Sequence, residues 1–185
     1  MLTFVTLTNN ELIMKKILFA LFALMAVMTV QAQSICGTLR TKQPVVETDE
    51  DGSFSAQSYV YTFNEDGTYN MVNEMTESTQ PAPTMAREIA CSIDLSGTYT
   101  LEGDQLTLTP NMDTYKADVL SVSQNGKVTE EPNMINYIKS MLNNPMVKNE
   151  MAAPQNITIK LAEPMLEMTE EGETISLMRL STINN

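Results

Sequence analysis

Residues 59–71 read Tyr59-Val60-Tyr61-Thr62-Phe63-Asn64-Glu65-Asp66-Gly67-Thr68-Tyr69-Asn70-Met71, and they predict two strands joined by a tight turn. Residues 64–67 suit a type I turn followed by a left-handed glycine, because Asn64 bonds its own backbone and Gly67 accepts a positive φ without steric cost. The turn sets three cross-strand pairs: Phe63 with Tyr69, Thr62 with Asn70, and Tyr61 with Met71. The first and third pairs share one apolar face, which predicts a core.

Two further hairpins repeat this division into an apolar and a polar face. A two-residue turn at Gly103-Asp104 pairs Leu101 with Leu106, Thr100 with Thr107 and Tyr99 with Leu108. A turn across residues 170–173 pairs Thr169 with Thr174, Met168 with Ile175 and Leu166 with Leu177. Three hairpins with one buried side each indicate an antiparallel sheet that curls round a core.

The remaining strands are assigned from alternation and turn residues. We expect strands over 36–46, 71–77, 89–101, 115–123 and 156–161, with turns at residues 49–52 and at Asn125-Gly126. A loop is predicted where Pro81 and Pro83 interrupt the chain. Because adjacent strands join through tight turns, eight to ten strands fit an antiparallel up-and-down barrel better than a Greek-key sandwich.

One segment before the last strands has helical periodicity. Pro132 suits the first turn of a helix and Asn143-Asn144-Pro145 ends it, which predicts a helix over 132–142 and an irregular segment over 146–154. Its apolar stripe consists of Met134, Ile135, Ile138, Met141 and Leu142. This stripe has to cover an apolar surface, so we expect the helix either over the mouth of the barrel as a lid or along its outer wall.

The amino-terminal region predicts export. Lys15-Lys16 precede an apolar run from Ile17 to Val30, and small residues before Gln33 fit a signal-peptide cleavage site. The run is shorter than the roughly 20 residues of a membrane-spanning helix. We therefore expect residues 1–32, in which Met14 is the better initiator, to be removed, and residues 33–185 to form one periplasmic or extracellular domain.

The two cysteines, Cys36 and Cys91, predict a disulfide, because their number is even and exported proteins meet an oxidising compartment. Two other uses stay open. Cys36 follows the signal closely enough for lipid attachment, although Ile35 and Gln33 do not fit a lipidation site. Alternatively, both cysteines are thiols.

Composition limits the chemistry that the chain performs. It carries 23 acidic and 11 basic residues, for a net charge of −12, which disfavours binding to nucleic acid and to anionic membranes. It contains no histidine, which excludes Ser-His-Asp and Cys-His catalysis and the usual zinc sites. The acidic pairs lie in expected turns and lack EF-hand spacing. We expect no enzyme activity, no metal and no cofactor.

Methionine is abundant, with 15 residues against five phenylalanines. Its unbranched, polarizable side chain lines adaptable apolar binding surfaces and also fills irregular gaps in ordinary cores. The composition alone favours neither use over the other.

Three stretches, 61–69, 96–108 and 172–179, resemble the secreted bacterial lipocalin-like domains. The resemblance implies an eight-stranded antiparallel barrel, open at one end, that binds small apolar molecules. Where lipocalins have Gly-x-Trp on the first strand, this chain has Gly37-Thr38-Leu39, so the tryptophan that an arginine like Arg179 would cover is replaced by leucine.

The resemblance implies a ligand site on the inner face of the barrel and beneath the helix. Its expected lining is Tyr61, Phe63, Tyr69, Met71, Tyr99, Leu101, Ile138 and Met141. The alternative function is a surface or periplasmic β-module that binds a protein or a glycan without an internal pocket.

Overall fold

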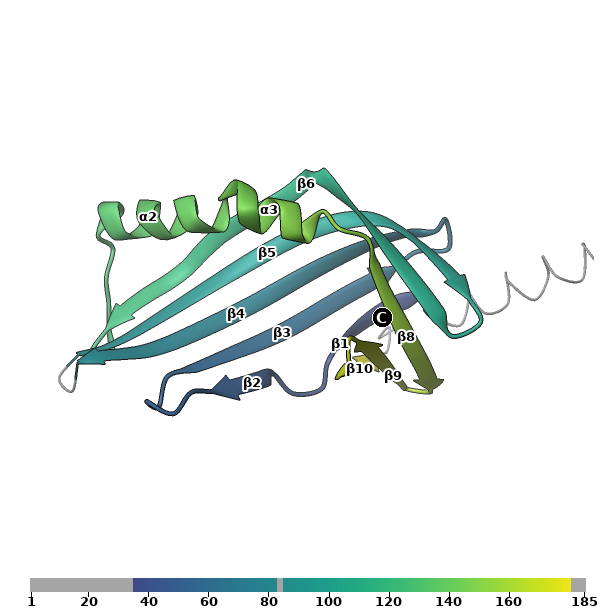
Figure 1. Cartoon of the computed structure of the whole chain (residues 1–185), viewed down its shortest axis with the longest axis horizontal. Coiled ribbons are helices and arrows are strands. Elements are labelled where there is room, and N and C mark those ends of the chain that lie inside the picture. The colour runs from purple at the N-terminus through teal and green to yellow at the C-terminus, as the bar shows by residue number, and fades with distance from the viewer. Residues whose placement is uncertain (1–34, 83–84, 181–185) are drawn as a thin grey trace, which may run out of the picture.

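The computed structural model describes residues 35–82 and 85–180, which form an antiparallel all-β fold with two helices (Figure 1). The strands are β1 (Gly37–Thr41), β2 (Val45–Thr48), β3 (Phe54–Phe63), β4 (Thr68–Ala82), β5 (Met85–Glu102), β6 (Gln105–Gln124), β7 (Lys127–Val128), β8 (Gln155–Ala162), β9 (Met165–Glu170) and β10 (Glu173–Arg179). The helices are α2 (Pro132–Leu142) and α3 (Pro145–Met151). The expected signal peptide, its cleavage site and the start at Met14 lie outside the described residues.

Strand pairing closes a ring. Neighbours along the chain pair antiparallel from β3 to β6 and from β8 to β10, while β6 pairs with β8 and β1 pairs with both β10 and β3. Within the described residues the ring contains eight strands, and β2 and β7 add to its edges. The up-and-down order predicted from the tight turns is therefore confirmed.

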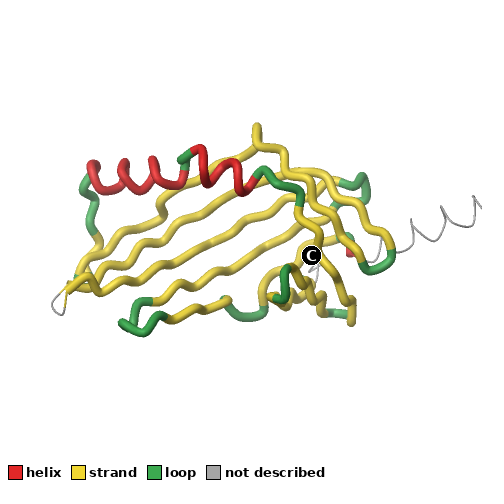
Figure 2. The backbone as a smooth tube through the Cα atoms, viewed as in Figure 1, coloured by secondary structure: helices red, strands yellow, loops and turns green. Residues whose placement is uncertain are grey.

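Four strands run well beyond the ring. The pairing of β8 with β6 ends at Leu108, and β1 pairs only with residues 60–63 of β3. The rest of β3, β4, β5 and β6 continues as a curved sheet, called the extension below, which is visible in the backbone trace (Figure 2). The helices α2 and α3 lie along the extension near β6, and α2 is at the end away from β9 and β10 (Figure 1).

The predicted hairpin registers are confirmed. Phe63 pairs with Tyr69, Leu101 with Leu106 and Leu166 with Leu177. The other cross-strand pairs predicted for these three hairpins are also present. At the first turn the Gly67 amide donates to the Asn64 carbonyl at 3.2 Å, and Gly67 has a φ of 79°. The local turn chemistry is therefore sufficient to set these pairings.

Four predicted boundaries are wrong. The strand expected over 36–46 is split into β1 and β2 just before Val45, because Pro44 has no N–H to continue a ladder. No loop begins at Pro81: β4 continues to Ala82, and a register shift after Thr79 accommodates the proline. The strand expected over 115–123 is the second half of β6, and α3 occupies most of the segment expected to be irregular.

The apolar side chains form two separate clusters on the inner face, the face that carries Phe63. The first fills the ring: Ile35, Leu39, Tyr61, Phe63, Tyr69, Met71, Leu95, Tyr99, Leu101, Leu106, Leu108, Ile157, Ile159, Leu166, Met168 and Leu177. The second lies in the extension beneath α2, where Cys91, Val122 and Ile138 are buried. Ile93, which lies between them on β5, is also buried but belongs to neither cluster.

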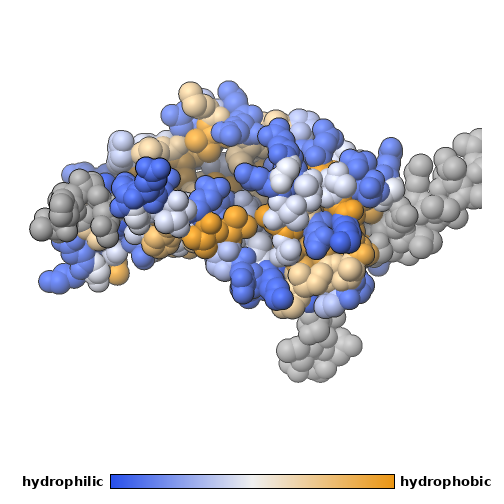
Figure 3. Space-filling model, turned by 60° about the horizontal axis from the view of Figure 1, so that its bottom comes forward, coloured by the Kyte–Doolittle hydropathy of each residue, from blue (hydrophilic) through white to orange (hydrophobic). Residues whose placement is uncertain are grey.

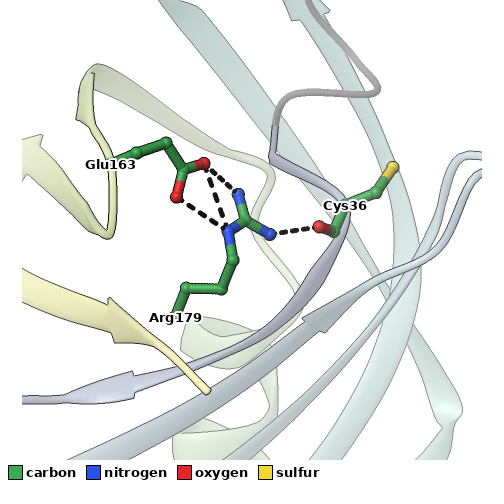
Figure 4. A network of polar contacts seen from close by, with 3 residues as sticks. All are labelled: Cys36, Glu163 and Arg179. Carbon is green, nitrogen blue, oxygen red and sulfur yellow. Dashed lines mark hydrogen bonds and ion pairs between the residues drawn. The ribbon is translucent and has the colours of Figure 1, made fainter. Parts of the chain in front are cut away.

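An arginine network ties the start of the described chain to the closing strands. The Arg179 side chain binds the Glu163 carboxylate at 2.8 Å, and its Nη1 donates to the Cys36 carbonyl (Figure 4). The hydrogen bond from Arg179 lowers the pKa of the Glu163 carboxyl. Leu39 on β1 is fully buried in the first cluster.

Candidate functional site

Six of the eight expected ligand-lining residues come together inside the ring, and they form a packed core. Tyr61, Phe63, Tyr69, Met71, Tyr99 and Leu101 all belong to the first cluster and are at most 7% exposed. The Phe63 ring stacks on Tyr61 with centroids 5.7 Å apart and meets Tyr99 edge-on at 5.1 Å. Their apolar surface is used in mutual contact, which leaves little of it for a ligand.

The hydrogen bonding of Tyr99 and the effect of burial on the tyrosine pKa values agree with a packed interior. The Tyr99 hydroxyl donates to the Asn64 carbonyl at 2.9 Å, so its polar atom is satisfied. Burial raises the pKa of Tyr69 to about 12 and raises the pKa of Tyr61 further. These phenols stay neutral at ordinary pH and act as structural side chains. Ile35, fully buried in the same cluster, fills more of the interior.

The expected disulfide is absent, and the strand geometry explains why. The Cys36 Sγ lies 3.5 Å from the Tyr99 hydroxyl in the ring, whereas Cys91 is buried in the second cluster and is not disulfide-bonded. Cys91 precedes Tyr99 by eight positions on β5, which is roughly 26 Å of extended strand. A disulfide needs Cα atoms about 4.4–6.8 Å apart. Burial also raises the pKa of the Cys91 thiol.

The inner face of the extension has a different character from the ring. Around its buried second cluster lie apolar side chains that are only half-buried, and they include Met75 on β4, Ile89 on β5, and Met134 and Ile135 of α2, which packs over this face. We call these four residues the apolar strip. In Figure 3, apolar side chains gather around a hollow in the middle of the face shown, with hydrophilic side chains around them. The extension therefore presents apolar surface that remains accessible.

Three interactions hold α2 in place over this face. Ile138 is buried against Cys91 and Val122. Lys139 forms an ion pair with Asp118 of β6 at 2.7 Å, and its hydrogen bond lowers the pKa of the Asp118 carboxyl. In the same last turn of the helix, the Tyr115 hydroxyl donates to the Leu142 carbonyl at 2.7 Å. The helix thus lies on the inner face of the extension, and not on the outer wall.

The helix is present with the predicted bounds, but one member of its expected stripe is misplaced. Met134, Ile135, Ile138 and Leu142 face the sheet, whereas Met141 is 53% exposed. The orientation that buries Ile138 turns Met141 toward the side of the helix that carries exposed Tyr137. Of the two helix residues expected to line the site, Ile138 contacts the second cluster and Met141 lies outside it.

Sequence reasoning missed two polar residues on the inner face. Asn73 has the same facing on β4 as Met71 and Met75, and Arg87 has the same facing on β5 as Ile89 and Cys91. The Oδ1 atom of Asn73 and the Nε atom of Arg87 are buried without a hydrogen-bond partner. In the sequence, Asn73 and Arg87 can be recognised because each is a polar residue within an otherwise apolar alternation.

A cavity of about 350 Å³ lies at the far end of the extension. It is lined by Glu47, Asp49, Asp51, Ser53, Phe54, Ser55, Met75, Glu77, Ser78 and Thr79, so it reaches the apolar strip through Met75. Hydrogen bonds from Ser53 lower the pKa of the Asp51 carboxyl. Among the described residues, no group of three or more histidine, cysteine, aspartate or glutamate side chains is placed to hold a metal ion.

Two other cavities lie where the register of β5 and β6 shifts near Ser96. Their volumes are about 500 and 430 Å³, and both are lined by Asn70 and Ser96. Asn70 and Ser96 have the facing opposite to Tyr69 and Leu95, so both cavities open on the outer side of the sheet, away from the apolar strip.

Within residues 35–82 and 85–180, no helix has the length and apolar character needed to cross a membrane. No protein-family model and no curated protein matches the sequence.

Proposed function

We propose that this protein is an exported, lipocalin-like carrier or sensor that binds a small apolar ligand on the inner face of the extension, beneath α2. The ring interior is filled by the protein's own side chains. We therefore place the ligand site on the extension, which continues the same inner face. The proposal includes no catalytic step, because the chain lacks histidine and its buried tyrosines stay neutral.

The apolar strip is the observation that carries this proposal. Met75, Ile89, Met134 and Ile135 are half-buried although they adjoin a buried cluster, so they keep apolar surface that a ligand can cover. Two of the four are methionines, whose side chains repack around ligands of different shape. Burial of apolar surface contributes about 25 cal/mol per Å². A ligand that covers this strip therefore gains affinity without displacing the core of the ring.

Binding of an uncharged apolar dye such as Nile red tests the proposal. We expect the double substitution Met134→Ser and Ile135→Ser to weaken dye binding by about tenfold or more, because each removes apolar contact worth roughly 1 kcal/mol. The matched control is Met141→Ser, on the same helix but turned to solvent, which should change the dissociation constant less than about twofold. Fluorescence titration gives the affinities, and thermal unfolding shows whether each variant remains folded.

A wild-type protein that binds no dye contradicts the proposal, as does an equal loss of affinity in the Met141→Ser control. Either result favours the second candidate, a module that binds another protein. The observation behind that candidate is an exposed apolar group on the helices, in which Tyr137 is 65%, Met141 53% and Met146 77% exposed.

A further inference from the structure

Arg87 stands on the inner face of the extension, close to the apolar strip. It pairs in register with Thr79 of β4 on one side and Gln124 of β6 on the other. Ile89, two residues further along β5, belongs to the apolar strip, and Thr79 lines the 350 Å³ cavity. Arg87 is therefore a cationic side chain at the end of an accessible apolar surface.

The half-buried Arg87 side chain has no acidic partner in the part of the chain that the structure describes, and part of its guanidinium is shielded from solvent. Its Nε atom is buried with no hydrogen-bond partner, and none of the ion pairs among the described residues includes Arg87. A buried donor on a charged group is costly to leave unpaired. In a chain with 23 acidic residues, an inward-facing arginine without a carboxylate partner is conspicuous.

The charged groups around Arg87 narrow the choice of partner. Glu77 has the same facing on β4, diagonal to Arg87, yet the two side chains form no ion pair. Glu47, Asp49 and Asp51 line the cavity beyond Thr79. Lys127, on β7, pairs with Gln124 and is exposed. The acidic groups repel an anion from the cavity itself, so an anionic head group is favoured only within direct hydrogen-bonding distance of the guanidinium.

We propose that Arg87 binds the carboxylate of the ligand, and that the ligand is a long-chain carboxylic acid whose apolar chain lies along Ile89 and Met75 beneath α2. The guanidinium matches a carboxylate with two parallel N–H donors. Asn73, with its unpartnered Oδ1, lies further along the same face and accepts a hydrogen bond from a hydroxyl group on the chain where one is present. This inference rests on the proposed function and adds the chemical class of the ligand.

The test compares dodecanoate with dodecan-1-ol, which share a chain and differ in the head group, by displacement of Nile red. We expect the wild-type protein to bind dodecanoate at least tenfold more tightly than dodecan-1-ol. Arg87→Gln should remove this preference. The affinity for dodecanoate should fall at least tenfold, while the affinity for dodecan-1-ol should change less than twofold. Arg87→Lys, which keeps the charge but loses the paired donors, should retain part of the preference.

Two further variants sharpen the test. Arg40→Gln, at an exposed arginine on β1, is the matched control and should change neither affinity. Glu77→Gln removes the repelling carboxylate diagonal to Arg87 and should strengthen the binding of dodecanoate but not of dodecan-1-ol. Equal wild-type affinities for the two compounds, or an unchanged preference in both Arg87 variants, would overturn the carboxylate site and leave the proposed function standing. A wild-type protein that binds neither compound nor the dye overturns both.

Discussion

Phe63→Asp is expected to unfold the protein or to lower its stability by at least about 4 kcal/mol, because Phe63 is 1% exposed and touches three tyrosine rings. The substitution removes these contacts and places a carboxyl group where no donor is available. In a domain of this size a loss of this magnitude lowers the melting temperature by roughly 10–15 °C. Thermal unfolding followed by circular dichroism measures it.

The neighbouring substitution Thr62→Asp is the matched control. Thr62 is half-buried on the outer face, where its Oγ1 lies 3.1 Å from Oγ1 of Thr38. Aspartate there remains hydrated and should cost only about 1 kcal/mol. Similar melting temperatures for the two variants would show that the assignment of inner and outer faces is incorrect.

Gly97→Ala is expected to cost about 3 kcal/mol or more, although it adds a single methyl group. A Cβ atom at Gly97 would lie 2.2 Å from the Thr109 carbonyl oxygen and 2.8 Å from Cε1 of Tyr69. The first of these contacts is to backbone of the paired strand, so β5 and β6 would have to separate to relieve it. Chemical denaturation gives the free energy of unfolding.

Gly103→Ala provides the comparison for that measurement. A Cβ atom there meets nothing within 4 Å, and the cost comes only from its positive φ of 67°, which amounts to about 1 kcal/mol. If Gly97→Ala proves no more destabilising than Gly103→Ala, the close approach of β5 and β6 at Gly97 is not a feature of the protein in solution.

The hairpins could be predicted because turn chemistry and two-residue alternation act locally. The pairs Phe63 with Tyr69 and Leu101 with Leu106 follow from the residues between them. The bounds of α2 follow equally from Pro132 and from the polar residues after Leu142. All of this information lies within about ten residues of each element.

Long-range features could not be read in the same way. The double pairing of β1 that closes the ring joins residues far apart in the chain. The long strand β5 also places Cys91 eight residues from Tyr99, which Cys36 contacts, so the even cysteine count predicted a bond that the strands keep from forming. Alternation indicated which side chains face inward, but not whether they would fill the interior or line a cavity.

The candidate site was predicted only in part for the same reason. The inward-facing Tyr61 and Phe63 pack inside the ring, whereas the accessible apolar surface lies on Met75 and Ile89, beyond it. Arg87 breaks the apolar alternation on β5, and this break is the feature of the sequence that points to the proposed carboxylate site.

The most direct test of ligand binding beneath α2 is native mass spectrometry of the protein, purified without added ligand. We predict a population heavier than the polypeptide by the mass of a small apolar molecule, which organic solvent removes and which is depleted in the Met134→Ser and Ile135→Ser double variant. A single species at the polypeptide mass, unchanged after incubation with dodecanoate or Nile red, would contradict the account.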